Sequence, residues 1–302
     1  MTIRKKASPF RIVMLAAVVA LSLALLYLAG GNQILYNLIA PSSQPQSYDL
    51  KVSMLDVGQG DSILLSSGGQ YMLIDAGEND QGDTVVSDLK SYGVDKLSAV
   101  VGTHPHSDHI GGLDTVIKTF PVDALYMPRK TANTQTYEEV LDAAAARSLK
   151  ITVPLPGDKL MLGKAEITFL WPPGDFDSTD ENDCSIVIMV EADGFKILLC
   201  GDIEKDAENG ILCMGEAVGC DVLKVAHHGS DTSSTKDFLK QAMPKVALIS
   251  VGLHNDYNHP DKSVLKRLSN IGAEVHRTDL NGTITVSIAD GKLTVQDSKK
   301  NK

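Results

Sequence analysis

Apolar runs of strand length, separated by glycine turns, open the main part of the chain. Residues 51–57, 62–67 and 70–75 each carry such a run, and the turns between them contain G-Q-G-D and G-G. This pattern predicts three consecutive strands. Residues 97–102, L-S-A-V-V-G, are apolar or small throughout, which is typical of a strand that is buried on both faces.

Helical and strand-like patterns alternate along the rest of the chain. Residues 84–93 form a helical pattern that Gly93 ends, and Thr136 with Glu139 predicts a capping box for a helix that runs to Arg147. The remaining predicted strands are 185–191 and 195–200 in a strand-rich block at 151–200, then 221–226, 245–251, 282–288 and 292–296, with helices near 236–243 and 262–271. Strands in two blocks with helices between them predict two sheets packed face to face, with the helices outside.

The N-terminal segment has a different pattern. Eighteen apolar or small residues, 12–29, follow a short basic tail, and no charged residue lies between Arg11 and Asp49. Eighteen helical residues reach roughly 27 Å, about the thickness of the hydrocarbon core of a bilayer. We therefore expect one transmembrane helix with the basic tail in the cytoplasm and the rest of the chain outside the cell. A cleaved signal peptide, which would make the protein secreted, is the alternative.

These patterns divide the chain into four segments. We expect a cytoplasmic basic tail at 1–11, the anchor or signal peptide at 12–29, and a linker at 30–49 that contains P-S-S-Q-P-Q-S. One folded domain should occupy residues 50–298.

Charge narrows the classes of partner. The chain carries 28 Lys and Arg residues against 38 Asp and Glu residues, and the part after Arg11 has a net charge of −14. Because phosphate neutralisation is the main source of nucleic-acid affinity, this surface excludes general nucleic-acid binding; a nucleic acid fits only as a substrate at a local positive centre. Bound metal ions would supply one. Cys213 and Cys220 could pair in an exported domain, although free thiols are the default.

Five of the eight histidines fall in two short bursts. The first burst, T-H-P-H-S-D-H-I-G-G at 103–112, holds His104, His106, Asp108 and His109. An extended loop can point His104 and His106 the same way, whereas the adjacent Asp108 and His109 should diverge, which suits two neighbouring ions better than one. Imidazole and carboxylate donors at this density are typical of zinc, manganese or iron sites.

Three predicted strands end in side chains of the same kind. Asp202 follows I-L-L-C-G, Asp75 follows M-L-I, and the histidine pair His227 and His228 follows V-L-K-V-A. A carboxylate at Asp202 can leave the core at this point and bridge two ions. A single acidic residue at a strand end is usually an exposed turn residue, but three such ends beside the histidine cluster predict one metal centre.

Together these motifs resemble the metallo-β-lactamase superfamily, and most closely the soluble domain of ComEC-like competence proteins. M-L-D-V-G-Q-G-D-S-I-L-L, L-I-D-A-G, T-H-P-H-S-D-H-I-G-G, N-D-C-S-I-V, L-L-C-G-D-I-E, L-K-V-A-H-H-G-S and S-V-G-L-H-N-D-Y-N-H-P occur in this order between Lys51 and about Ser287. The resemblance implies an α/β fold, an αββα sandwich with the metal site at one edge, here preceded by one N-terminal transmembrane helix. It does not imply DNA transport, because a single span cannot conduct DNA.

The resemblance also implies two divalent metal ions, zinc first, with manganese or iron as alternatives. Their ligands would be imidazoles and carboxylates: His104, His106 and Asp202 for the first ion, and Asp108, His109, His228 and the shared Asp202 for the second. Asp75 would orient a ligand imidazole. His227 and His259 are candidates for proton delivery or oxyanion stabilisation beside Asp108 and Asp202, and Asn255 and Tyr257 are weaker candidates.

One departure from the family concerns the first ion. The superfamily usually adds a third histidine there, and in this chain no histidine lies between His109 and His227. Asn182 and Asp183 stand where it would be expected. We therefore expect the first site to be the weaker one and the one open to substrate, and the sequence leaves the number of ions open.

The functional prediction is a membrane-anchored, extracytoplasmic binuclear metallohydrolase. Two ions about 3.5–4 Å apart can polarise a phosphoryl oxygen and generate a hydroxide near neutral pH, so a phosphodiesterase is favoured, with a nucleic-acid strand, a nucleotide or a cell-wall phosphodiester as substrate. The first alternative is a lactonase or β-lactamase that acts on an acyl substrate. The second is a non-catalytic binding module associated with DNA uptake or the envelope, which would be expected to have lost some ligands.

Overall fold

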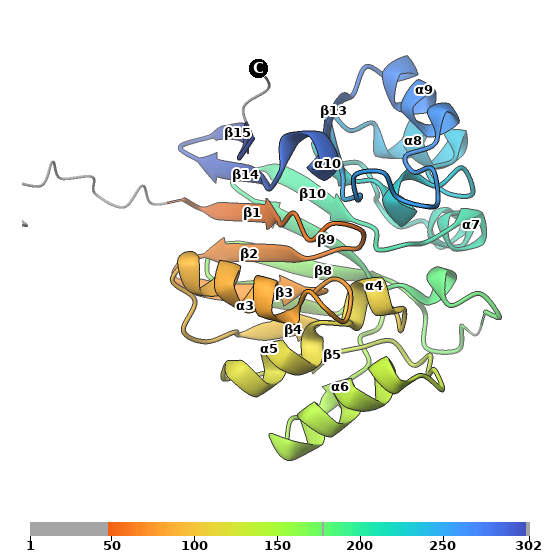
Figure 1. The fold of residues 1–302 in the computed structure, drawn as a ribbon. Helices are drawn as coiled ribbons and strands as arrows, with labels where there is room; N and C mark the ends of the chain where they lie inside the picture. Colours follow the sequence, from red (N-terminus) through yellow and green to blue (C-terminus); the bar gives the residue numbers. More distant parts are fainter. Residues whose placement is uncertain (1–47, 177, 300–302) are drawn as a thin grey trace, which may run out of the picture. The chain divides into compact units, whose positions relative to one another are not determined.

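Two mixed β-sheets lie face to face at the centre of the fold in the computed structural model, which describes residues 48–176 and 178–299 (Figure 1). The predicted tail and membrane span and almost all of the predicted linker lie outside the described residues. Among the helices of the described part, none combines the length and the apolar character needed to cross a membrane.

The first sheet has eight strands in the order β15-β14-β1-β2-β3-β4-β5-β6. Their bounds are β1 Leu50–Met54, β2 Ile63–Ser67, β3 Gln70–Ile74, β4 Ala99–Val101, β5 Leu125–Tyr126, β6 Ile151–Thr152, β14 Ile284–Ala289 and β15 Lys292–Asp297. β14 pairs antiparallel with β1 and with β15, whereas β3, β4, β5 and β6 run parallel to one another. The C-terminal hairpin of β14 and β15 therefore extends the sheet beside the first strand of the domain.

The second sheet has seven strands in the order β13-β12-β11-β10-β9-β8-β7. Their bounds are β7 Lys159–Leu162, β8 Ala165–Trp171, β9 Val187–Ala192, β10 Phe195–Leu199, β11 Val222–Lys224, β12 Val246–Ile249 and β13 Glu274–Arg277. The pairs from β7 to β10 are antiparallel, and the pairs from β10 to β13 are parallel.

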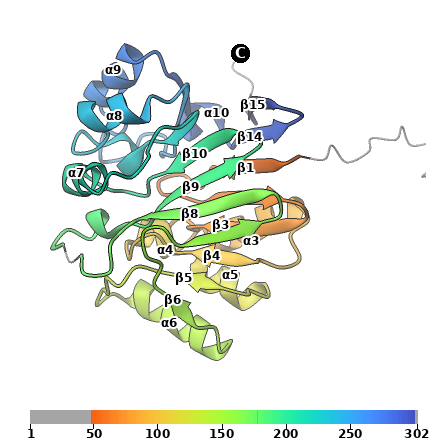
Figure 2. The ribbon, with the colours of Figure 1, turned by 180° about the vertical axis from the view of Figure 1, so that it is seen from behind.

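Helices cover the outer face of each sheet (Figures 1 and 2). The first sheet carries α3 Gly82–Ser91, α4 Ser107–Ile110, α5 Leu113–Thr119 and α6 Gln135–Ala146, and the second carries α7 Lys205–Cys213, α8 Lys236–Ala242 and α9 Lys262–Asn270. A short helix α10 Thr278–Asn281 and the 3₁₀ turns η1 Asn182–Cys184 and η2 Ala226–Gly229 complete the described elements. This arrangement confirms the predicted αββα sandwich.

Side chains of successive strand residues enter different layers of the core. On β2, Ile63 and Leu65 pack between the two sheets, and Leu64 packs under the helices of the first sheet. Leu73 of β3 also packs under the helices of the first sheet. Because both faces of each sheet are covered, these strands are continuous apolar runs in the sequence.

One local prediction differs from the structure. The N-cap of α6 is Thr134, whose hydroxyl accepts the Tyr137 N–H at 3.2 Å, so the predicted capping box at Thr136 is wrong. The Thr136 hydroxyl instead donates to Asn79 Oδ1 at 3.0 Å, because the helix begins earlier and places Thr136 within its first turn. Cys213 and Cys220 are free thiols, which was the default expectation from the sequence.

Candidate metal centre

The ends of parallel strands bring the candidate residues to one edge of the sandwich. Asp75 follows β3, and the histidine cluster follows β4, its parallel neighbour. In the other sheet Asp202 follows β10, and His228 follows β11, again its parallel neighbour. The carboxyl ends of such strands are where α/β folds place ligand sites.

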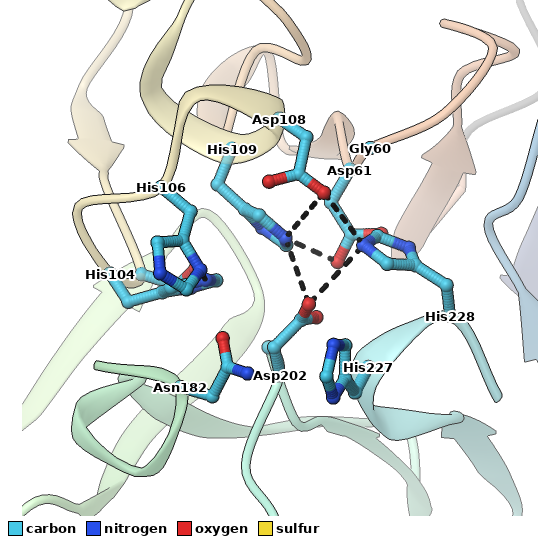
Figure 3. Close-up of polar contacts among 12 residues, drawn as sticks. Gly60, Asp61, His104, His106, Asp108, His109, Asn182, Asp202, His227 and His228 are labelled. Carbon is cyan, nitrogen blue, oxygen red and sulfur yellow. Dashed lines mark hydrogen bonds and ion pairs between the residues drawn. The ribbon is translucent and has the colours of Figure 1, made fainter. Parts of the chain in front are cut away.

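Four donor atoms converge at this edge (Figure 3): Asp108 Oδ2, His109 Nε2, Asp202 Oδ2 and His228 Nε2. His228 Nε2 lies 3.2 Å from each of the two carboxylate oxygens. His109 Nε2 lies 3.2 Å from Asp202 Oδ2 and 3.8 Å from Asp108 Oδ2. Four tetrahedral ligands at about 2.0–2.1 Å from an ion stand roughly 3.3 Å from one another. The described residues therefore fit one divalent ion here, at the predicted second site.

The outer nitrogen of each imidazole is fixed by another group. His109 Nδ1 donates to Asp75 Oδ2 at 2.8 Å, and His228 Nδ1 donates to the Ser250 carbonyl at 2.9 Å. Asp75 is itself held by Thr103, whose N–H and hydroxyl donate to it at 2.8 and 2.7 Å. Such partners orient a ligand imidazole so that Nε2 faces the ion.

The protonation of this cluster also fits a cation. Burial alone would lower the pKa of His228, but Asp202 and Asp108 outweigh it and raise that pKa to about 10. Burial likewise opposes the charge of His109, yet Asp202 and Asp108 raise its pKa well above the ordinary value. Burial would raise the pKa of Asp202, but His109, His228 and Lys224 hold it well below the ordinary range. In the metal-free protein, protons on the two imidazoles thus neutralise the charge of the carboxylates. A bound divalent ion would take over this role.

The predicted first site has two donors from the histidine loop. His104 Nε2 and His106 Nδ1 lie 3.1 Å apart. The opposite nitrogens are occupied: His104 Nδ1 lies 3.1 Å from the Thr103 hydroxyl, and His106 Nε2 lies 3.3 Å from Glu181 Oε2. Burial, and then His109, lower the pKa of His104 well below its ordinary value, so this imidazole is neutral. Two imidazoles with their inner nitrogens facing each other fit a metal ion.

Beside the histidine loop lies the turn η1, at the position where the family supplies a third histidine. Asp183 does not face the centre, because its Oδ1 accepts the N–H groups of Glu204 and Ala207 at 2.8 and 3.2 Å and so caps α7. Asn182 lines the same cleft as His106 and Asp202.

A buried lysine and a buried aspartate complete the surroundings of the centre. Lys224 of β11 is fully buried, donates to the Gly201 carbonyl at 2.7 Å, and lies 2.5 Å from Asp61 Oδ2 and 3.2 Å from Asp202 Oδ1. Burial would lower the pKa of the Lys224 ammonium, but Asp61 and Asp202 raise it above its ordinary value. Lys224 therefore occupies Oδ1 of Asp202 and leaves Oδ2 for metal ions.

The remaining candidates line the mouth of the cleft, which has a volume of about 320 Å³. His227 Nδ1 lies 2.9 Å from Glu204 Oε1, and the His227 ring lies edge-on to the His259 ring at 5.5 Å. Tyr257 stacks on His259 at 5.7 Å and is 66% exposed. Asn255 shapes the loop instead, because its side chain bonds the backbone N–H and carbonyl of His259 at 3.0 and 2.7 Å.

Backbone strain is concentrated at this edge. Asp75, His227 and His228 have positive φ angles of 59°, 50° and 51°, a region that residues other than glycine rarely adopt. Gly60 has a φ of 117° and lies so close to the histidine loop that a Cβ would stand 2.2 Å from the Asp108 carbonyl oxygen. The loop before β2 can therefore approach Asp108 only because residue 60 is glycine.

The structure thus gathers the predicted ligands, with Asp75, His227 and His259, around one cleft, whereas Asp183 and Asn255 support neighbouring backbone. It also adds residues that the sequence reasoning missed. The missed residues contact the predicted ones from outside: Asp61, Glu181, Ser185, Glu204 and Lys224. A lysine inside the apolar strand V-L-K-V-A was a signal for Lys224. Asp61 stood in G-Q-G-D, which reads as a turn.

Comparisons with known proteins show the family of the chain. A family model described as the metallo-beta-lactamase superfamily matches residues 55–253. ComE operon protein 3 from Bacillus subtilis (strain 168) is 34% identical over 252 residues, which cover 78% of this chain and 32% of that protein. Competence protein ComA from Neisseria gonorrhoeae is 30% identical over 258 residues, which cover 85% of this chain and 35% of that protein. The chain thus spans about a third of the length of these relatives.

Among solved structures, a CmlA beta-hydroxylase mutant superimposes with a TM-score of 0.52 at 12% identity, over 82% of this chain and 55% of that one. At this identity the likeness concerns the fold alone. The fold of the superfamily implies divalent metal ions, and the described residues offer a donor set for them. The match of the family model and the competence-protein relatives show that the chain belongs to the metallo-β-lactamase superfamily, in its ComEC-like branch.

Proposed function

We propose that the protein is a binuclear metal-dependent phosphodiesterase. The observation that carries the proposal is the convergence of Asp108, His109, Asp202 and His228 at one open cleft, with the paired imidazoles of His104 and His106 beside them. When bound, two divalent ions supply Lewis-acid activation of a phosphoryl group and of the attacking water.

Metal ions would have to supply the positive charge for an anionic substrate. Among the described residues that line the cleft, none is Lys or Arg, and Glu78, Asp108 and Asp202 are acidic. A phosphodiester would therefore find its positive partners in the metal ions.

His227 and His259 are placed to handle protons at the cleft mouth. Glu204 holds His227 from behind, and the hydrogen bond from His227 keeps the pKa of Glu204 below its ordinary value. Burial, with His227 and His228 nearby, lowers the pKa of His259, so its imidazole is neutral near pH 7 and can accept or pass on a proton. We propose that one of the two takes a proton from the attacking water and passes it to the leaving oxygen.

The relatives favour one substrate class among the phosphodiesters. They carry the names competence protein ComA and, for a Haemophilus influenzae relative that is 29% identical, Recombination protein 2. Both names favour a nucleic-acid strand over a cell-wall phosphodiester. Because the chain spans about a third of each relative, this assignment concerns the cleft and not the whole activity of those proteins.

A substrate panel tests the proposal. The metal-loaded protein should hydrolyse a generic phosphodiester faster than a phosphomonoester, a lactone or a β-lactam. Asp202→Ala should abolish the reaction and keep the fold, which circular dichroism checks. Preferential hydrolysis of the lactone or the β-lactam would favour the acyl-hydrolase alternative, and binding of metal without any hydrolysis would favour a non-catalytic module.

We also propose that residues 12–29 anchor this domain at the outer face of the cell membrane. The basis is the uncharged run behind the basic tail. Protease added to intact cells should digest the domain, while the protein otherwise fractionates with membranes. Protection until lysis would reverse the proposed orientation, and recovery of the domain in the medium would favour a cleaved signal peptide.

A further inference from the structure

Asn182 carries an unpaired oxygen at the centre of the cleft. The residue is 8% exposed, and its Nδ2 donates to Glu204 Oε1 at 3.4 Å. Its Oδ1 is buried and has no hydrogen-bond partner. Buried polar atoms are normally paired, so an orphan of this kind in a ligand cleft points to a missing partner. Because Glu204 accepts hydrogen bonds only, it fixes which end of the amide is the oxygen.

The neighbours of Asn182 in the chain hold the two histidines of the first site from outside. Glu181 Oε2 lies 3.3 Å from His106 Nε2, and the Ser185 hydroxyl lies 3.2 Å from His104 Nδ1. Asn182 lies between these two residues in sequence, and Figure 3 shows its oxygen pointing toward the inner side of the histidine pair.

The inner nitrogens of that pair lie opposite each other. His104 Nε2 and His106 Nδ1 are 3.1 Å apart and hydrogen-bond to each other in the protein without metal. The outer nitrogens have other partners: Thr103 and Ser185 at His104 Nδ1, and Glu181 at His106 Nε2. A cation between the two inner nitrogens would take the place of the proton that they share.

We propose that Asn182 Oδ1 is a protein ligand of the first metal ion, together with His104 Nε2, His106 Nδ1 and Asp202 Oδ2. The amide oxygen thus takes the place of the third histidine. This inference rests on the metal centre of the proposed function. Asp183, the other candidate from the sequence, is excluded because its carboxylate caps α7.

The replacement of an imidazole by an amide oxygen determines which of the two sites binds its ion more tightly. A neutral amide oxygen is a weaker donor for zinc than an imidazole, and the second site has the additional charge of Asp108. The first ion is therefore the weaker one, yet it is held by the protein on four sides and not by the histidines and Asp202 alone.

Titration of the metal-free full chain with Co²⁺, followed by visible absorption, tests this ligand. The wild type should take up two equivalents. Asn182→Leu removes the oxygen at nearly constant side-chain size. The tighter Co²⁺-binding step should persist, and the affinity of the weaker step should fall by at least about tenfold. Asn182→His should restore two steps. Asn281→Leu is the matched control: Asn281 is 7% exposed, and both ends of its amide are paired, with Arg277 N–H and Asp297. It should leave both steps unchanged.

Asn182→Asp separates a ligand from a structural residue. An aspartate keeps an oxygen and adds charge, so a ligand role predicts an affinity for the first ion equal to or above that of the wild type. A structural role through the Nδ2–Glu204 bond predicts a loss, because two carboxylates would face each other. Wild-type affinities in Asn182→Leu, or a loss in Asn182→Asp, would overturn the proposal. Co²⁺ binding is measured without hydrolysis. The result on Asn182 therefore remains valid even if the phosphodiesterase proposal fails.

Discussion

Replacing Lys224 by methionine would leave two buried carboxylates beside each other without their cation. The Lys224 ammonium lies within 3.2 Å of both Asp61 and Asp202 and is fully buried. Methionine fills a similar volume and offers no charge. Removing one partner of a buried ion pair costs about 3–5 kcal/mol, because the other charge stays buried and uncompensated. We expect this loss in the metal-free protein.

Urea unfolding of the metal-free protein measures the effect. At a slope of about 3 kcal/mol per molar urea, the midpoint for Lys224→Met should fall by roughly 1–2 M. Metal ions should narrow the difference, since they also neutralise Asp202. Adding Asp61→Asn to the variant should recover part of the loss, because it removes one of the stranded charges.

The control is Lys245→Met. Lys245 also pairs with an aspartate, Asp221, at 2.9 Å, but its side chain is 79% exposed. Water replaces the lost partner there, and the midpoint should not move. A Lys224→Met midpoint as little changed as that of the control would refute the view that Lys224 neutralises the buried carboxylates.

Three further predictions concern protons and ligands. Burial raises the pKa of Glu208 from 4.5 to about 7, so its contribution to stability is present below pH 4.5 and is lost as the pH rises through 7, by about 3 kcal/mol. Glu208→Gln should remove that part of the pH dependence of the melting temperature, and parallel profiles of the two proteins would contradict the reasoning. The pKa of His228 is about 10 in the metal-free protein, so metal binding at pH 7 should release protons. The apparent affinity for the metal ion should therefore rise with pH. Calorimetry in buffers of different ionisation enthalpy measures the number of protons released. His228→Ala should lose metal and His227→Ala should keep it, and equal metal loss in the two variants would show that the ligand within this pair is misassigned.

The fold followed from the sequence because its strands are buried on both faces. Runs such as 71–74 and 99–101 have no charged or amide side chain, and a sheet that is covered on both faces accommodates them. Helix α7 was not predicted, since Asn209 and Gly210 are poor helix formers. It is held by tertiary contacts: Asp183 caps it from another element, and Gly210 fits beneath Trp171, where a Cβ would stand 2.5 Å from the ring.

The donors of the site could be found from the sequence, and their supports could not. Histidines in a short cluster and acids at strand ends are visible as patterns. The residues that orient them are common polar residues in turns, and their role depends on a contact across the sandwich. Glu204, for example, meets Asn182 and His227 only after the end of β10, η1 and η2 are packed together.

The number of metal ions needed for hydrolysis tests the central claim most directly. Metal-free protein is titrated with one divalent metal, and binding and phosphodiester cleavage are measured in the same samples. The first equivalent should fill the site of Asp108, His109 and His228 and give little activity, and the rate should rise with the second equivalent at His104 and His106. Full activity with a single equivalent, or two bound equivalents without cleavage, would contradict a two-metal phosphodiesterase.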